Sequence, residues 1–191
     1  MEDKVLAAAT SGNIEAMEEL LSSGANPNSR DEFGWSALMW ASAMDFPEMV
    51  KLLLDRGADP NIRDQYQASA LMKACRRGFV EVVKHLLNRK AVVNAEDEFG
   101  WTALMRAARR GHAEVVRLLL EERAKSEAVD QYGATAIVMA ASEGHSDVVR
   151  ELLKHGANIK ATDRNGWTAM MWATSMHHTD VVKALLEFER A

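Results

Sequence analysis

The chain has 191 residues, of which 48% are hydrophobic and 27% charged, and its formal net charge is −5 at pH 7. This composition is typical of a folded globular protein, and no segment approaches the roughly 18 unbroken apolar residues that a membrane-spanning helix needs. The negative net charge argues against a protein whose surface binds nucleic acid. Cys75 is the single cysteine, which excludes an internal disulfide and leads us to expect an intracellular, cytoplasmic protein.

The first segment, residues 1–30, contains two short apolar patterns that are separated by Gly12 and followed by Gly24. Its start is polar, with Glu2, Asp3 and Lys4, and no basic start followed by an apolar run is present, so no secretory signal is expected. The segment is therefore predicted to be a polar cap made of two helices.

From residue 31 onward the sequence is periodic. Aspartates recur at intervals of 33 residues, at Asp31, Asp64, Asp97, Asp130 and Asp163. They open four repeats of equal length and a shortened fifth, at residues 31–63, 64–96, 97–129, 130–162 and 163–191. A period of this length indicates a stack of small, similar structural units.

Each repeat is predicted to contain two helices. A hydroxyl residue precedes an alanine and an apolar run in every repeat, at Ser36, Ser69, Thr102, Thr135 and Thr168. Such a hydroxyl accepts hydrogen bonds from the free N–H groups that open a helix. A second apolar pattern with i, i+3, i+4 spacing follows about ten residues later, as in residues 114–120. One helix pair cannot bury its apolar face alone, so an all-α repeat solenoid is predicted.

The phrase Asp97-Glu-Phe-Gly-Trp-Thr-Ala-Leu-Met-Arg-Ala-Ala-Arg-Arg-Gly-His resembles the ankyrin repeat. The resemblance covers almost the whole chain. It implies an ankyrin repeat stack of helix-turn-helix units joined by β-hairpin-like loops, in a single domain at 1–191 with residues 1–30 as the N-terminal cap. It also implies a non-enzymatic protein-binding module whose hairpin tips and first helices line a concave groove.

Two departures from the family pattern concern backbone and core. Non-glycine residues stand where the other repeats have turn glycines, at Asp45, Gln67, Lys90, Arg123 and His177. Either these turns have another shape, or each residue adopts a left-handed conformation at a cost of about 1 kcal/mol. Methionines replace the family's histidine at Met39, Met72, Met105 and Met171. We interpret them as core packing, with a methionine-rich sticky surface as the alternative.

The candidate binding residues are aromatic tip residues together with cations and apolar residues of the first helices. They are Phe33, Trp35, Trp40, Tyr66, Lys73, Arg76, Arg77, Phe99, Trp101, Arg106, Arg109, Arg110, Tyr132, Met139, Trp167 and Trp172. Aromatic residues and arginine are enriched at binding hot spots. Six cations and no acid occupy the first helices of the repeats at 64–96 and 97–129, which predicts a central basic patch that attracts acidic partners.

The tryptophans at the tips alternate with alanines. Trp35, Trp101 and Trp167 lie one repeat away from Ala68 and Ala134. If neighbouring repeats are about 10 Å apart, this alternation predicts two shallow recesses. The other interpretation is that each indole covers its own hairpin.

The leading hypothesis is a module that binds an acidic or phosphorylated protein segment. Small-ligand or oligonucleotide binding in the same groove is an alternative, with bases stacked on tryptophan. A further alternative is an engineered scaffold in which Lys73, crowded by Arg76 and Arg77, acts as an amine nucleophile. No cofactor and no metal are expected, because zinc-protease, nucleophile-elbow and P-loop motifs are missing and His177 and His178 are adjacent.

The last repeat keeps apolar residues where a terminal repeat normally turns polar, including Met171, Val181 and Leu185. We therefore expect that the array continues in a longer protein, associates end to end with itself, or frays at this end.

Overall fold

The computed structural model describes residues 2–190, with the side chain of Glu2 left aside. Met1 and Ala191, the two ends of the predicted domain, lie outside the described residues. Between residues 2 and 190 the chain forms twelve helices and no strand, which confirms the predicted all-α repeat architecture. The chain divides into two compact units, residues 1–98 and 99–191. This division falls within the predicted repeat 97–129, and the single domain remains a prediction.

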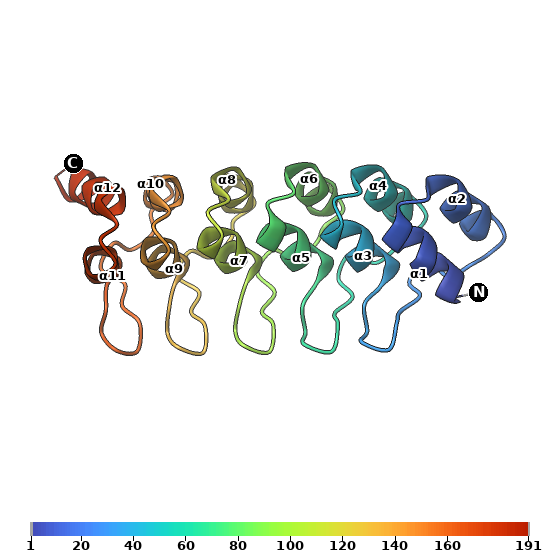
Figure 1. Cartoon of the computed structure of the whole chain (residues 1–191), viewed down its shortest axis with the longest axis horizontal. Helices are drawn as coiled ribbons and strands as arrows, with labels where there is room; N and C mark the ends of the chain where they lie inside the picture. Colours follow the sequence, from blue (N-terminus) through green and yellow to red (C-terminus); the bar gives the residue numbers. More distant parts are fainter. Residues whose placement is uncertain (1, 191) are drawn as a thin grey trace. The chain divides into compact units, whose positions relative to one another are not determined.

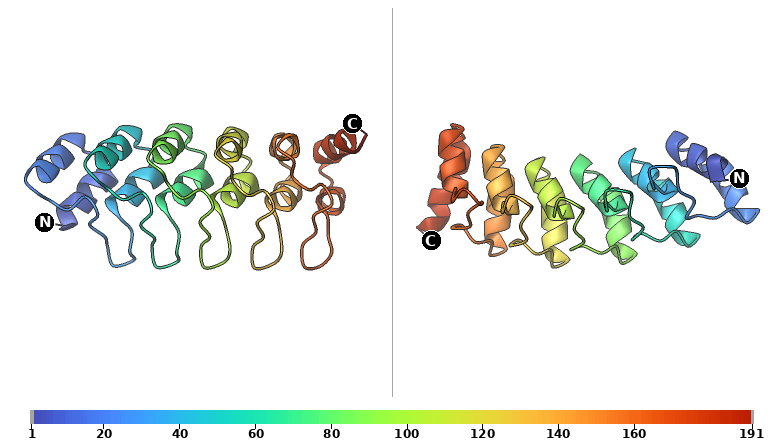
Figure 2. Two further views of the ribbon diagram at one scale, coloured as in Figure 1. Left: turned by 180° about the vertical axis from the view of Figure 1, so that it is seen from behind. Right: turned by 90° about the horizontal axis from the view of Figure 1, so that it is seen from below.

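The first unit consists of three helix pairs, in which each first helix runs beside its second helix (Figure 1). The first helices α1, α3 and α5 pack in a row, and α4 packs on both α2 and α6. Hairpin loops project from the first-helix side (Figures 1 and 2). The helices of this unit are α1 (Glu2–Ser11), α2 (Ile14–Ser22), α3 (Ala37–Ala43), α4 (Pro47–Asp55), α5 (Ala70–Arg77) and α6 (Val80–Asn88).

The second unit repeats the same arrangement. Its first helices α7, α9 and α11 pack in a row, and α10 packs on α8 and α12. The helices of this unit are α7 (Ala103–Arg109), α8 (Ala113–Glu121), α9 (Ala136–Ser142), α10 (Ser146–Lys154), α11 (Ala169–Ser175) and α12 (Thr179–Glu189).

Hydroxyl caps open the first helices, with one exception. The side chains of Ser36, Ser69, Thr102 and Thr168 each accept a hydrogen bond from the backbone N–H three residues later. Thr135 precedes α9 as predicted, but its side chain makes no cap bond and its buried Oγ1 has no partner among the described residues. The prediction of a side-chain cap is therefore wrong at Thr135.

The core of each unit is formed by alanines and long aliphatic side chains between the helix layers. Met39, Met72 and Met105 are at most 1% exposed, as the packing interpretation predicts. Met171 stands at the same repeat position but is 52% exposed, so this interpretation is wrong for Met171. The reason is that no further first helix packs against this side of α11 among the described residues.

The turn positions that lack glycine keep the glycine conformation. Asp45, Gln67, Lys90, Arg123 and His177 have φ angles between 60° and 62°, in the left-handed region. The turns have therefore not changed shape, which decides between the two alternatives drawn from the sequence. Each of these residues carries the steric cost of a Cβ in this conformation, on the order of 1 kcal/mol.

Candidate functional site

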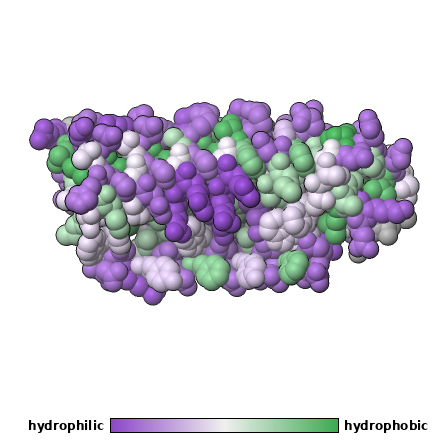
Figure 3. Space-filling model, viewed as in Figure 1, coloured by the Kyte–Doolittle hydropathy of each residue, from purple (hydrophilic) through white to green (hydrophobic). Residues whose placement is uncertain are grey.

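The aromatic tips of the hairpins are exposed but held in place. Phe33, Tyr66, Phe99 and Tyr132 are 44–64% exposed, and hydrophobic surface reaches the hairpin tips in Figure 3. Within each unit neighbouring hairpins are joined by backbone bonds, such as Gln65 N–H to the Phe33 carbonyl at 3.1 Å and Arg164 N–H to the Tyr132 carbonyl at 2.9 Å. These side chains therefore lie on fixed loops and do not contribute to the core.

The aspartate that opens each repeat organises its hairpin. In the repeat at 64–96, one carboxylate oxygen of Asp64 accepts hydrogen bonds from the N–H groups of Tyr66 and Ala68, both at 2.9 Å. The corresponding bonds recur at Asp31, Asp130 and Asp163. The aspartate column thus fixes the loop that carries the aromatic tip.

The second oxygen of the same aspartate binds a side chain nine residues later. The indole N–H groups of Trp40 and Trp172 donate to Asp31 and Asp163, at 2.9 and 3.0 Å. Both indoles also pack against the tip tryptophans of their own repeats. The ring centroids of Trp40 and Trp35 are 4.5 Å apart, and those of Trp172 and Trp167 are 4.9 Å apart. Trp40 and Trp172 are thus used within their own repeats.

Lys73 occupies the same position in the repeat at 64–96 and is also used within the fold. Its Nζ lies 2.6 Å from Asp64 Oδ2 and 4.0 Å from the ring centroid of Trp35. The side chain of Lys73 is 16% exposed and that of Asp64 is fully buried. A buried carboxylate at this distance favours the charged ammonium. The geometry therefore argues against the hypothesis of an amine nucleophile at Lys73.

The arginines of α5 and α7 differ in their surroundings. Arg109 pairs with Glu143, with Nε and Oε1 3.1 Å apart, and the guanidinium carbons of Arg109 and Arg106 lie 5.2 and 5.8 Å from the ring centroid of Trp101. Arg77 and Arg110 are exposed, and within residues 2–190 neither forms an ion pair. Arg76 is exposed as well.

The second helices carry ion pairs that neutralise their own surface. Lys84 bonds to Glu81 at 2.7 Å, and this hydrogen bond lowers the pKa of Glu81. Arg150 pairs with Glu187 in the same way, and its hydrogen bond is the main reason why the pKa of Glu187 is lowered. The second helices therefore carry charges of both signs, and these ion pairs do not form a surface of one sign.

A cavity of about 370 Å³ opens in the second unit, at the Ala134 recess that the tryptophan alternation predicts. It is lined by Trp101, Arg109, Asp130, Tyr132, Ala134, Val138, Met139, Ser142, Glu143, Asp163, Asn165 and Trp172. The lining contains five of the predicted site residues, from the hairpins and first helices. Trp172 is part of the lining, whereas Trp167, which the alternation predicts beside this recess, is not.

Sequence reasoning missed Asp130 and the whole aspartate column as site residues. The signal was available, because a donor side chain stands nine residues after Asp31, Asp64 and Asp163, whereas Met139 stands nine residues after Asp130. The aspartates were treated only as markers of the period. In the structure these aspartates have a second function, because their other oxygen binds a cation or an indole N–H.

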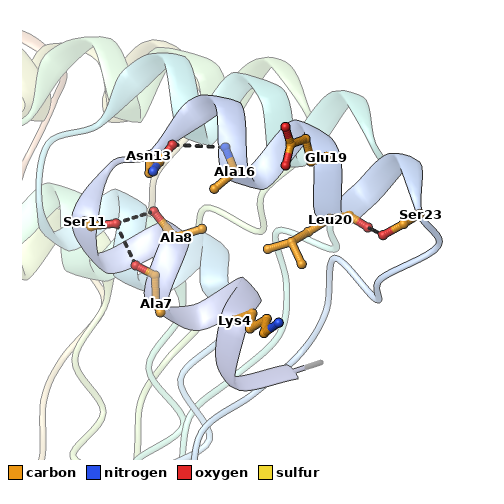
Figure 4. A pocket seen from close by; sticks show the side chains of 9 residues that line it. All are labelled: Lys4, Ala7, Ala8, Ser11, Asn13, Ala16, Glu19, Leu20 and Ser23. Atoms are coloured by element: carbon orange, nitrogen blue, oxygen red, sulfur yellow. Dashed lines mark hydrogen bonds between the residues drawn. The ribbon is translucent and has the colours of Figure 1, made fainter.

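A second hollow, of about 620 Å³, lies on the cap between α1 and α2 (Figure 4). Its polar groups are used locally: Ser11 Oγ donates to the Ala7 carbonyl at 2.8 Å, and Asn13 Oδ1 accepts from Ala16 N–H at 3.0 Å. Most of the other side chains that line it are small or long and flexible. Nothing in this hollow is arranged to bind a specific ligand.

Two histidines and the single cysteine contribute to the structure of the repeats. His145 and His178 donate through Nε2 to the carbonyls of Arg109 and Ser142, both at 3.1 Å, and thereby connect one repeat to the next. Cys75 is fully buried. Among residues 2–190 no group of three or more histidine, cysteine or acidic side chains could hold a metal. The described helices also include none that is long and apolar enough to cross a membrane.

The family model for three copies of the ankyrin repeat matches residues 5–64, 43–130, 71–163 and 122–190. These overlapping matches cover nearly all of the chain. The chain belongs to the ankyrin repeat family. Ankyrin repeats generally mediate protein–protein interaction, and proteins of the family are typically not enzymes.

Two solved ankyrin structures are similar to this chain over almost their full lengths. An ankyrin repeat domain from Acinetobacter baumannii AYE is 30% identical, covers 97% of each chain and has a TM-score of 0.89. The ankyrin repeat protein EF0377 is 29% identical, covers 98% of each chain and has a TM-score of 0.90. Among curated proteins no match to the sequence is found. The similarity to these structures confirms the ankyrin fold.

Proposed function

We propose that this ankyrin repeat chain recognises an acidic or phosphorylated segment of a partner protein. Each unit provides a binding face of its own, made of its hairpin tips and first helices. Aromatic tips contact apolar residues of the segment, and arginines at the ends of α5 and α7 contact its carboxylates or phosphates. Guanidinium groups suit this task because they bind both anions in a bidentate manner.

The exposed aromatic tips carry the proposal. Tyr132 is 64% exposed, and its backbone carbonyl and N–H are both bonded, to Arg164 and to Asp130. A large aromatic side chain on a loop that is already ordered loses little conformational entropy on binding, and such residues dominate the energy of protein interfaces. Exposed aromatic residues at this position in four hairpins have no role in the core.

Arg77 and Arg110 support the proposal that the partner segment is acidic or phosphorylated. Both are exposed at the ends of first helices, and no acid among the described residues pairs with them. Lys73 and Arg109, which belonged to the same sequence pattern, are already paired with Asp64 and Glu143. Arg77 and Arg110 are therefore expected to form the ion pairs with the acidic or phosphorylated groups of the partner.

A peptide-array experiment tests the proposal directly. The array presents 12-residue peptides with a central glutamate or phosphoserine cluster beside copies with glutamine or serine at these positions. We expect the chain to prefer the anionic peptides. Raising the ionic strength should weaken binding, because exposed charges are screened within about 8 Å at physiological salt. A short oligonucleotide serves as a further probe for the alternative ligand class.

Charge reversal locates the binding face. The double variant Arg77→Glu/Arg110→Glu is expected to lose the preference for anionic peptides. The control Lys51→Glu/Lys160→Glu changes the net charge by the same amount at two exposed lysines elsewhere, and it should retain the preference for anionic peptides. Equal binding of neutral peptides, or retained preference in the Arg77→Glu/Arg110→Glu variant, would contradict the proposal.

We also propose that copies of the chain associate through the last repeat, in a reducing, cytoplasmic setting. Met171, Met176 and Leu186 are 38–52% exposed there, whereas Met105 at the position of Met171 is buried. The buried thiol of Cys75 fits a compartment in which cysteines remain reduced.

A further inference from the structure

The cavity of the second unit contains a buried carboxylate with one unused oxygen. Asp130 is 6% exposed and lines the cavity. One of its oxygens accepts hydrogen bonds from the N–H groups of Tyr132 and Ala134, at 2.8 and 2.9 Å. No side-chain donor among residues 2–190 binds its second oxygen, and the side chain nine positions later, that of Met139, has no N–H or O–H group. This second oxygen is not among the fully buried side-chain atoms of the described residues that lack a partner, so a ligand in the cavity can reach it.

The same chain shows what fills such a site when a donor is present. Two repeats earlier, at a distance of 66 residues, Asp64 and Trp35 stand at the positions of Asp130 and Trp101. There the ammonium group of Lys73 lies 2.6 Å from the carboxylate and 4.0 Å from the indole centroid. The lysine position of this arrangement is Met139 in the second unit. The carboxylate and the tryptophan are retained, whereas the cation is not.

The lining of the cavity favours a positive ligand. It contains one cation, Arg109, and three acids, Asp130, Glu143 and Asp163. Arg109 and Glu143 pair with each other at 3.1 Å, and Asp163 already accepts the indole N–H of Trp172 at 3.0 Å. The remaining charge of the lining is negative, and its unsatisfied part is Asp130.

Aromatic walls complete the site. Trp101, Tyr132 and Trp172 line the cavity beside the carboxylate. The faces of indole and phenol rings attract cations, most strongly when water is excluded. The volume of about 370 Å³ also lies within the range of pockets that hold small ligands or single side chains.

We propose that this cavity binds the ammonium group of a lysine side chain from a partner protein, which donates to Asp130 Oδ2 and lies against the aromatic walls. The ligand thus takes the place that Lys73 fills internally in the first unit. A neutral indole, as in Trp172, also satisfies a carboxylate, but the negative lining selects a cation. A protein lysine fits better than a free amine, because the exposed Tyr132 at the rim offers further contact to a polypeptide.

Nuclear magnetic resonance of the full chain with a lysine probe tests the site. The probe is Nα-acetyl-lysine methylamide, and its neutral control is Nα-acetyl-norleucine methylamide. We expect the lysine probe to shift the indole N–H signals of Trp101 and Trp172 with a saturable dependence on concentration. The norleucine probe should bind at least about tenfold more weakly, because it lacks a hydrogen bond to a charged group.

Two variants separate a specific site from general attraction. Asp130→Asn keeps the oxygen that the hairpin needs and removes the negative charge, so the affinity for lysine is expected to fall roughly tenfold to hundredfold. Met139→Lys supplies an internal ammonium, as Lys73 does for Asp64, and should abolish binding of the probe. A thermal unfolding curve confirms that each variant is folded.

The outcomes are decisive. Binding that is equal for both probes, or unchanged in Asp130→Asn and Met139→Lys, would overturn the proposal. A lysine-containing peptide should bind more tightly than n-butylammonium; the reverse order would show that the ligand is a free amine and not a protein side chain. The Arg77→Glu/Arg110→Glu variant should bind the lysine probe like the native chain, so this inference and the proposed acidic partner can fail independently.

Discussion

At the scale of single residues, backbone strain is concentrated at the five non-glycine turn residues. Lys90 and Gly57 occupy the same position of neighbouring repeats, with φ angles of 60° and 87°. A Cβ built on Gly57 meets no atom within 4 Å. Any difference between glycine and another residue in this turn therefore comes from the backbone conformation alone and not from a steric clash with neighbours.

Lys90→Gly is therefore expected to stabilise the protein by up to about 1 kcal/mol, because glycine adopts the left-handed conformation without strain. The reverse change in the neighbouring repeat, Gly57→Ala, should destabilise it by a similar amount. Urea unfolding of both variants beside the native chain measures the two effects. A loss of stability in Lys90→Gly would mean that the side chain of Lys90 makes a contribution larger than the strain.

At the scale of elements, the two threonines that precede α7 and α9 form a natural comparison. Thr102 Oγ1 accepts a hydrogen bond from Met105 N–H at 3.3 Å. Thr135 Oγ1 is buried, and none of the described residues is its partner. Both residues are 2–3% exposed, so replacing the hydroxyl by a methyl group changes little besides the hydrogen bond.

Thr102→Val should cost about 1 kcal/mol of unfolding free energy, the usual value of an N-cap. Thr135→Val should be neutral or stabilising, since it removes a buried hydroxyl that no protein group satisfies. Thermal or urea unfolding of the two variants gives the comparison. Equal losses in both would show that Thr135 is satisfied in solution, for example by water.

At the scale of the whole molecule, the proposed self-association depends on the exposed apolar side chains of the last repeat. We expect weak, concentration-dependent self-association of the native chain in sedimentation velocity experiments. The variant Met171→Glu/Leu186→Glu should be monomeric at all concentrations, because burying the new carboxylates is unfavourable. Val92→Glu/Val129→Glu is the matched control, since both valines are 52% exposed and lie elsewhere. A native chain that is monomeric at every concentration would refute the association.

The sequence by itself determined the repeats, their two helices and the exposed tips. These features depend on local order: an aspartate and a hydroxyl at fixed positions, and an apolar period that recurs every 33 residues. Their partners lie a few residues away or at the same position of the next repeat. Pattern alone was therefore sufficient to predict the family, the all-α fold and the aromatic tips such as Phe33 and Tyr132.

Only the tertiary structure decided which side chains are already used and which remain available. From the sequence, Lys73 and Arg109 were interpreted as cations of a basic patch. In the structure Lys73 pairs with Asp64, and Arg109 pairs with Glu143. Asp130 was interpreted only as part of the 33-residue period, whereas the structure shows that one of its carboxylate oxygens binds no side-chain donor among the described residues. Such pairings depend on distances of a few ångströms between separate elements, and a one-dimensional spacing cannot specify those distances.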